Sequence, residues 1–259
     1  MTSLQARASL AGVLVYFTLA SCAVAPPEEV PANLPKGPET ILFVGNSFTF
    51  WRGGLWKHMD VLTAARGEGS GAKSDRVVRG GASLEVMWKR TKAKDKIIAG
   101  DYDVVVLQED LPETKVESFH EYAAKFDALV RESGARPVFF MAWDYERLGW
   151  ISMDEIMAEH STMSGRLGAE VAPVGMAWYQ AMNERPELDM YGKDREHPSA
   201  YGTHLALLVI YATIYGESPE GLDYAPPTDS GITAEEDAFL RRIAGQAVRI
   251  WKRYRKGVA

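Results

Sequence analysis

The chain has 259 residues, of which 46% are hydrophobic and 25% charged, and its formal net charge at pH 7 is −6. This is the composition of an ordinary globular protein, and the length allows one α/β domain of about 200 residues with additional segments. The mild acidity argues against nucleic acid as a partner. The chain has a single cysteine, Cys22, which excludes an intrachain disulfide.

Residues 1–22 are predicted to be a lipoprotein signal peptide. One cation, Arg7, precedes an apolar run from Leu10 to Ala20, which is too short for a permanent membrane span and fits the apolar core of a signal peptide. The run closes in Leu-Ala-Ser-Cys at residues 19–22, which resembles the lipobox of bacterial lipoproteins. That resemblance implies lipidation of Cys22 and a stable anchor at the bacterial cell envelope. The alternative is ordinary cleavage after Ala23-Val24-Ala25, which would release a secreted or periplasmic soluble protein.

Residues 23–39 are predicted to form an extended tether. The segment contains five prolines, which rule out a helix and stiffen the chain: Pro26, Pro27, Pro31, Pro35 and Pro38. The folded domain is therefore expected to begin near Thr40 and to cover residues 40–259.

From Thr40 onward, short apolar runs alternate with helix-like stretches. The predicted strands, several of them continuous and β-branched, are Thr40–Val44, Arg76–Arg79, Asp103–Leu107, Pro137–Ala142 and Val171–Val174. The predicted helices are Leu55–Arg66, Leu84–Lys94, Ser118–Ser133, Met153–Leu167, Ala177–Asn183, Pro198–Tyr215 and Ala234–Lys256. This alternation predicts a parallel sheet with helices on both faces, in which ligands bind beyond the carboxyl ends of the strands.

The residues that follow the predicted strands form a distinctive set. The first four strands lead into Gly45-Asn46-Ser47, Gly80-Gly81-Ala82-Ser83, Gln108-Glu109-Asp110 and Trp143-Asp144, and the later segment before a predicted helix contains Asp194 and His197. Because the carboxyl ends of parallel strands meet at one edge of a sheet, these side chains are expected to converge there.

Three members of this set can carry out acyl transfer. Ser47 would be the nucleophile, His197 the base that takes its proton, and Asp194 the carboxylate that orients the imidazole. Pro198 suits the first position of the helix that follows and would hold His197 at the mouth of that helix. Asn46 is expected to stabilise the turn by bonding to its own backbone.

The tetrahedral intermediate of acyl transfer also needs fixed donors for its oxyanion. The candidates are the backbone amides of Ser47 and Gly81 and the side-chain NH2 of Gln108. Gly81 fits because a residue without a Cβ allows the closest approach of the backbone.

These motifs resemble those of the SGNH hydrolases, the GDSL-like superfamily of lipases and esterases, and in particular a bacterial branch whose first block reads Gly-Asn-Ser-Phe-Thr. The resemblance covers Thr40 to about Glu220 and assigns the first, second and last blocks to Gly45-Asn46-Ser47, Gly80-Gly81 and Asp194-x-x-His197. The third block departs from the family pattern of Gly-x-Asn-Asp, since it reads Val-Leu-Gln-Glu at residues 106–109. The resemblance implies a three-layer α/β/α sandwich with a five-stranded parallel sheet, as in flavodoxin-like folds.

Other chemistry fits the sequence less well. The five histidines form no metal-binding pair, no nucleotide-binding glycine motif occurs, and no cofactor is predicted. His204 is expected to be structural. Trp143 is the candidate substrate contact, because it follows the fourth strand at the edge where the site is expected.

The sequence therefore predicts an exported, membrane-anchored serine esterase with an acyl-enzyme on Ser47. Its substrate would be a small-molecule or glycan ester, with a short acyl group and an alcohol part that could be a carbohydrate. Two alternatives remain open. One is a catalytically inactive envelope lipoprotein that binds glycan, and the other is an acyltransferase that uses the same triad.

Overall fold

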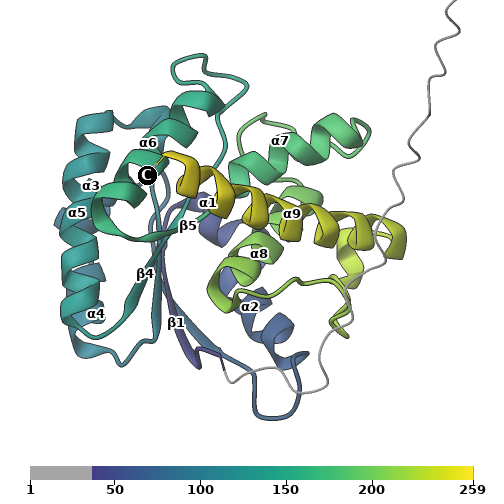
Figure 1. Ribbon diagram of the computed structural model, residues 1–259, viewed down its shortest axis with the longest axis horizontal. Helices are drawn as coiled ribbons and strands as arrows, with labels where there is room; N and C mark the ends of the chain where they lie inside the picture. Colours follow the sequence, from purple (N-terminus) through teal and green to yellow (C-terminus); the bar gives the residue numbers. More distant parts are fainter. Residues whose placement is uncertain (1–36, 259) are drawn as a thin grey trace, which may run out of the picture.

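The computed structural model describes residues 37–258, which fold into a three-layer α/β/α sandwich (Figure 1). The central sheet is parallel, with strand order β2-β1-β3-β4-β5. The strands are β1 (Thr40–Gly45), β2 (Lys73–Val78), β3 (Val104–Gln108), β4 (Arg136–Phe140) and β5 (Glu170–Ala172). The predicted fold class is confirmed. Cys22 and the predicted tether up to Lys36 lie outside the described residues.

Two hydrophobic cores lie on the two faces of the sheet. Successive side chains of β1 alternate between them, with Ile41 and Phe43 in one core and Leu42 and Val44 in the other. Every residue of β3 is buried as well. A strand covered on both faces needs apolar residues at every position, which is why these strands read as continuous apolar runs in the sequence.

Helices cover both faces of the sheet (Figure 1). One layer contains α2 (Leu55–Ala64), α7 (Val174–Glu184), α8 (Ala200–Tyr215) and α9 (Ala234–Val258), and the other contains α3 (Leu84–Arg90), α4 (Ala93–Ala99), α5 (Val116–Glu132) and α6 (Met153–Leu167). Four short elements complete the fold: α1 (Ser47–Phe50) and the 3-10 turns η1 (Trp51–Gly53), η2 (Leu111–Glu113) and η3 (Thr228–Ser230).

Helix α8 is buried on almost all sides. It packs against α2, α7 and α9, and all of its residues from Gly202 to Ile214 are buried. A helix in this position has no solvent-facing side, so its sequence is largely apolar. Within residues 37–258, no helix is both long and apolar enough to cross a membrane.

Several element boundaries differ from the sequence prediction; α7, for example, begins at Val174 rather than Ala177. Strand β2 begins at Lys73 rather than Arg76, because it is the edge strand and its first residues are polar and only partly buried. The helix predicted over Leu84–Lys94 is two helices separated at Thr91, whose backbone is extended. Helix α8 is capped by Ser199, whose hydroxyl accepts from the Gly202 amide. Pro198 therefore precedes the cap and is not the first helical residue.

Candidate active site

The turn after β1 presents Ser47 at the carboxyl edge of the sheet. Asn46 is the N-cap of α1, and its Oδ1 accepts a hydrogen bond from the Phe48 amide across 3.0 Å. The predicted role of Asn46 in holding the turn is thereby confirmed. A Cβ at Gly45 would lie 2.4 Å from Thr49 Oγ1 and 2.8 Å from Gln108 Oε1, so only glycine fits at this position.

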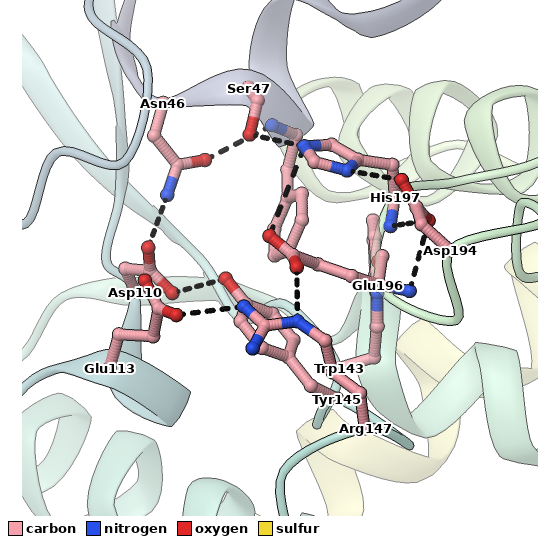
Figure 2. A network of polar contacts seen from close by, with 11 residues as sticks. Asn46, Ser47, Asp110, Glu113, Trp143, Tyr145, Arg147, Asp194, Glu196 and His197 are labelled. Carbon is pink, nitrogen blue, oxygen red and sulfur yellow. Dashed lines mark hydrogen bonds and ion pairs between the residues drawn. The ribbon is translucent and has the colours of Figure 1, made fainter.

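The structure brings Ser47, His197 and Asp194 together in one hydrogen-bonded chain (Figure 2). His197 Nε2 lies 2.8 Å from Ser47 Oγ, and Nδ1 lies 2.9 Å from Asp194 Oδ2. With Nδ1–H donated to the carboxylate, Nε2 is the acceptor for the serine proton. This is the geometry that activation of a serine nucleophile requires.

Asp194 is fixed by backbone donors as well as by the imidazole. Its Oδ1 accepts from the His197 amide across 3.0 Å and from the Glu196 amide across 3.2 Å. Burial alone would raise the pKa of Asp194, but these bonds and the bond from the His197 ring outweigh it and hold the pKa below its ordinary value. The carboxylate is therefore ionised at neutral pH.

The loop that carries Asp194 and His197 is tied to the loop after β4. Trp143 Nε1 donates to the Glu196 carbonyl across 2.9 Å, and the Glu146 amide donates to the Arg195 carbonyl across 3.2 Å. Arg147 bridges Glu196 and Glu113 (Figure 2). These bonds hold the loop that carries His197 against the loop after β4.

Trp143 follows β4 as predicted, but its side chain is not exposed at the site. Its side chain is fully buried, with the ring stacked between Phe48 at 4.5 Å and Trp178 at 3.7 Å between ring centroids. The predicted role as a substrate contact is corrected, because a ring packed on both faces cannot stack on a ligand. Trp143 instead supports α1 and the histidine loop.

Trp51 is the aromatic residue that lies at the site. Its ring stacks on the imidazole of His197 with 3.9 Å between centroids and 18° between planes, and the residue is 36% exposed. No role for Trp51 is predicted from the sequence. The available signal was its position four residues after Ser47, since a short helical turn brings such a residue back beside the nucleophile.

Gly81 lies in the loop after β2, with φ at +58°. Nothing lies within 4 Å of a Cβ built on it, so the glycine is required by its left-handed backbone and not by lack of space. This loop is tied to β3 by the buried carboxylate of Glu109, which accepts from the Leu84 amide across 3.2 Å and from the Asp110 amide across 2.7 Å. No sequence pattern predicts these hydrogen bonds of Glu109.

The side chain of Gln108 is not available as the oxyanion donor that the sequence predicts. Its side chain is fully buried, its Oε1 accepts from the Asn46 amide across 2.8 Å, and its NH2 donates to the Glu109 carbonyl. The orientation of the amide is fixed, because the atom facing the Asn46 N–H must be an acceptor. The prediction is therefore corrected: Gln108 holds the nucleophile turn.

Two buried acids, Glu109 and Asp110, follow β3 next to the nucleophile turn. Asp110 accepts from Tyr145 Oη across 2.6 Å and from Asn46 Nδ2 across 3.0 Å. Burial raises the pKa of Asp110 to about 6 and the pKa of Glu109 to about 7. In residues 37–258, no set of three or more His, Cys, Asp or Glu side chains is arranged to hold a metal ion.

Comparison with known proteins places this geometry in a structural context. No protein-family model matches the sequence, and neither does any curated protein. A protein from Slackia heliotrinireducens, provisionally described as an SGNH hydrolase, matches with 26% identity and a TM-score of 0.57, over 67% of this chain and 97% of that chain.

Two further structures agree in fold. A DUF4886 family protein from Bacteroides uniformis is 14% identical with a TM-score of 0.59, over 81% of this chain and 94% of that one. An acetyl-xylooligosaccharide esterase from Geobacillus is 17% identical with a TM-score of 0.54, over 70% and 95% of the two chains. The chain therefore has the fold of the SGNH hydrolases, a five-stranded parallel sheet between two layers of helices.

Proposed function

We propose that this chain is a serine esterase that hydrolyses acyl esters through an acyl-enzyme on Ser47. The observation that carries the proposal is the continuous chain of hydrogen bonds from Ser47 Oγ through His197 to Asp194. Structural similarity to SGNH hydrolases supports ester hydrolysis at the level of the superfamily.

The first half of the reaction forms the acyl-enzyme. Ser47 Oγ attacks the ester carbonyl while His197 Nε2 takes the hydroxyl proton, and Asp194 stabilises the imidazolium that results. The tetrahedral intermediate collapses when the C–O bond to the alcohol breaks and the imidazolium gives its proton to the leaving oxygen. In the second half, His197 activates water, which attacks the acyl-enzyme and releases the carboxylic acid and free Ser47.

The oxyanion donors in this mechanism are backbone amides. The Ser47 amide is at the N-terminus of α1, and the backbone amide of Gly81, in the loop after β2, is the proposed second donor. Gln108 is excluded from the donor set by its burial and by its bonds to the turn. Glu109 acts as a positioning residue, because it connects the loop of Gly81 to the end of β3.

The proposed acyl group is short, and acetyl on a carbohydrate is the preferred substrate. One structural neighbour is named an acetyl-xylooligosaccharide esterase and another an acetyl xylan esterase, although both resemble this chain in fold alone. The proposed location is the bacterial cell envelope, with a lipid anchor at Cys22. That residue lies outside the described part of the chain, so the location rests on the sequence.

The test of the function is replacement of Ser47 in a chain that starts at Pro26. Ser47→Ala should lower kcat for short-chain acyl esters by at least about a thousandfold while the melting temperature stays unchanged. An organophosphonate should label the wild-type protein at Ser47, as mass spectrometry can establish. Ser164→Ala, a buried serine on α6 away from the site, is the matched control.

Two results would contradict the proposal. Labelling at a serine other than Ser47 would remove the assigned nucleophile. Absence of both labelling and hydrolysis would favour the inactive, glycan-binding alternative.

A further inference from the structure

A cavity is lined by residues that neighbour the candidate active site in the chain. It has a volume of about 410 Å³, within the range of small-molecule sites. Arg52 and Gly53, which follow Trp51 in η1, line one wall, and Ala200, three residues after His197, lines another. The triad residues do not line the cavity themselves, and the link to the site is Trp51, which precedes Arg52 in the chain and stacks on His197.

The buried polar residues of this cavity are Thr203 and His204, and His204 is held in place from α9. Its Nε2 lies 2.6 Å from Asp237 Oδ1, and Asp237 Oδ2 accepts from Arg241 across 2.9 Å. Burial lowers the pKa of His204, so the ring is neutral at pH 7 and donates Nε2–H to the carboxylate. Among the described residues, none bonds Nδ1, which therefore remains an acceptor for a ligand hydroxyl.

Another wall comes from the segment between α8 and α9, which contributes Tyr224, Asp229 and Ile232 to the lining. Arg241 donates to the carbonyls of Pro219, Leu222 and Tyr224, which fixes the segment between α8 and α9. The Tyr224 ring lies nearly parallel to the His204 ring, at 17° and 6.0 Å between centroids. Two buried side chains, His204 of α8 and Arg241 of α9, therefore hold these walls in place.

The lining suits a ring that carries several hydroxyl groups. Tyr224, Leu207 and Ile232 offer aromatic and aliphatic surface for C–H faces. His204 accepts a hydrogen bond, the Arg52 guanidinium donates, and the Asp229 carboxylate accepts. Arg52 makes no ion pair with another described residue, lines the cavity and has φ at +49°, a conformation that non-glycine residues rarely adopt.

We infer that this cavity binds the alcohol part of the ester and that this part is a polyhydroxylated ring of the size of a monosaccharide. The inference rests on the proposed function, because it assigns the cavity to the leaving group of that reaction. Cleavage of the ester bond would then occur at the Trp51 side of the cavity, where the leaving oxygen takes its proton from His197. A neutral sugar fits better than an acidic one, since the Asp229 carboxylate also lines the cavity and would repel a second carboxylate.

The test compares two acetyl esters, an acetylated monosaccharide and ethyl acetate, whose alcohol is too small to fill the cavity. Ile232→Trp places an indole in the cavity, and Ala200→Phe narrows it from the α8 side, so that one blocking variant remains if the other does not fold. Either should lower kcat/KM for the sugar ester by at least about tenfold relative to ethyl acetate. Ile98→Trp, on the exposed face of α4, is the matched control and should leave the ratio unchanged.

A binding measurement separates this inference from the proposed function. In the Ser47→Ala protein, saturation-transfer NMR should detect methyl glucoside, and Ile232→Trp in the same background should remove the signal. If the wild-type chain hydrolyses neither ester but still binds the sugar at this cavity, the proposed function fails and the binding site stands. If hydrolysis is normal but the blocking variants change neither the ratio nor the binding, the assignment of the cavity is overturned.

Discussion

Gln108 and Asp110, at and just after the end of β3, hold the turn that carries Ser47. The Asn46 amide donates to Gln108 Oε1 and the Asn46 side chain donates to Asp110 Oδ2. All three residues are buried, so water cannot replace a partner that is removed. The position of the nucleophile thus depends on two buried hydrogen bonds to the neighbouring strand.

We expect Gln108→Ala to weaken both the fold and the reaction. Loss of the acceptor leaves the Asn46 amide buried and unpaired, which costs about 1–3 kcal/mol of unfolding free energy. The turn would relax, and kcat would fall with it, since small shifts of a nucleophile are costly. Urea unfolding and steady-state kinetics of the same preparation measure both effects.

Gln180→Ala is the control, because Gln180 is a glutamine of α7 whose amide bonds Glu184 and Gln246 on helices away from the site. A loss of kcat without a loss of stability in Gln108→Ala would restore the original interpretation of Gln108 as an oxyanion donor.

The three side chains of the hydrogen-bonded chain at the site could be picked out from the sequence, while the places of the residues around them could not. Residue type and position in the chain point to these three. Ser47 follows the first predicted strand, and Asp194 and His197 lie just before a predicted helix. Trp143 and Trp51 both lie near the sheet edge, and only the packing of α1 decides which is buried. Side-chain burial depends on tertiary contacts that no local pattern reports.

At the scale of elements, the predicted strands and helices are present because each has a strong local pattern. The buried strands are apolar throughout, and the last helix begins with Thr233 and Glu236 in a reciprocal capping arrangement. The errors fall where tertiary structure overrides pattern. The edge strand β2 has polar residues, and a predicted single helix breaks at Thr91.

Glu109 makes the connection between β3 and α3 sensitive to pH. Burial raises its pKa from 4.5 to about 7, so the folded state binds a proton more tightly than the unfolded chain does. The stability that this proton contributes is fully present below about pH 4.5 and is lost as the pH rises to about 7. Asp110, whose pKa is raised to about 6, acts in the same direction.

Glu109→Gln should therefore flatten the pH dependence of stability between pH 4.5 and 7, because the amide keeps an acceptor for Leu84 and does not titrate. The measurement is the urea-unfolding free energy at several pH values in that window. Glu117→Gln, an exposed acid in the first turn of α5, is the control and should leave the slope unchanged. An equal slope in wild type and Glu109→Gln would show that Glu109 ionises normally.

At the scale of the whole molecule, the chain enters the domain at the end of the sheet opposite the site. The Glu39 and Thr40 amides donate to Asp103 at the amino end of β3, and Tyr215 donates to the Pro38 carbonyl. Ser47 lies beyond the other end of β1, a six-residue strand about 20 Å long. An anchor upstream of residue 37 would therefore attach at the end of the domain away from the triad.

That geometry gives the lipid-anchor proposal a two-part test in bacterial cells that process lipoproteins. Cys22→Ser should move the protein from the membrane fraction to the soluble fraction, because the lipid attaches through the thiol. It should change kcat/KM for a small soluble ester by less than about twofold, since the triad lies at the far end of the domain. A chain that starts at Pro26 is the soluble control for both measurements. A Cys22→Ser protein that stays in the membrane fraction would point to a retained apolar segment, and wild-type protein found only in the soluble fraction would point to cleavage after Ala25.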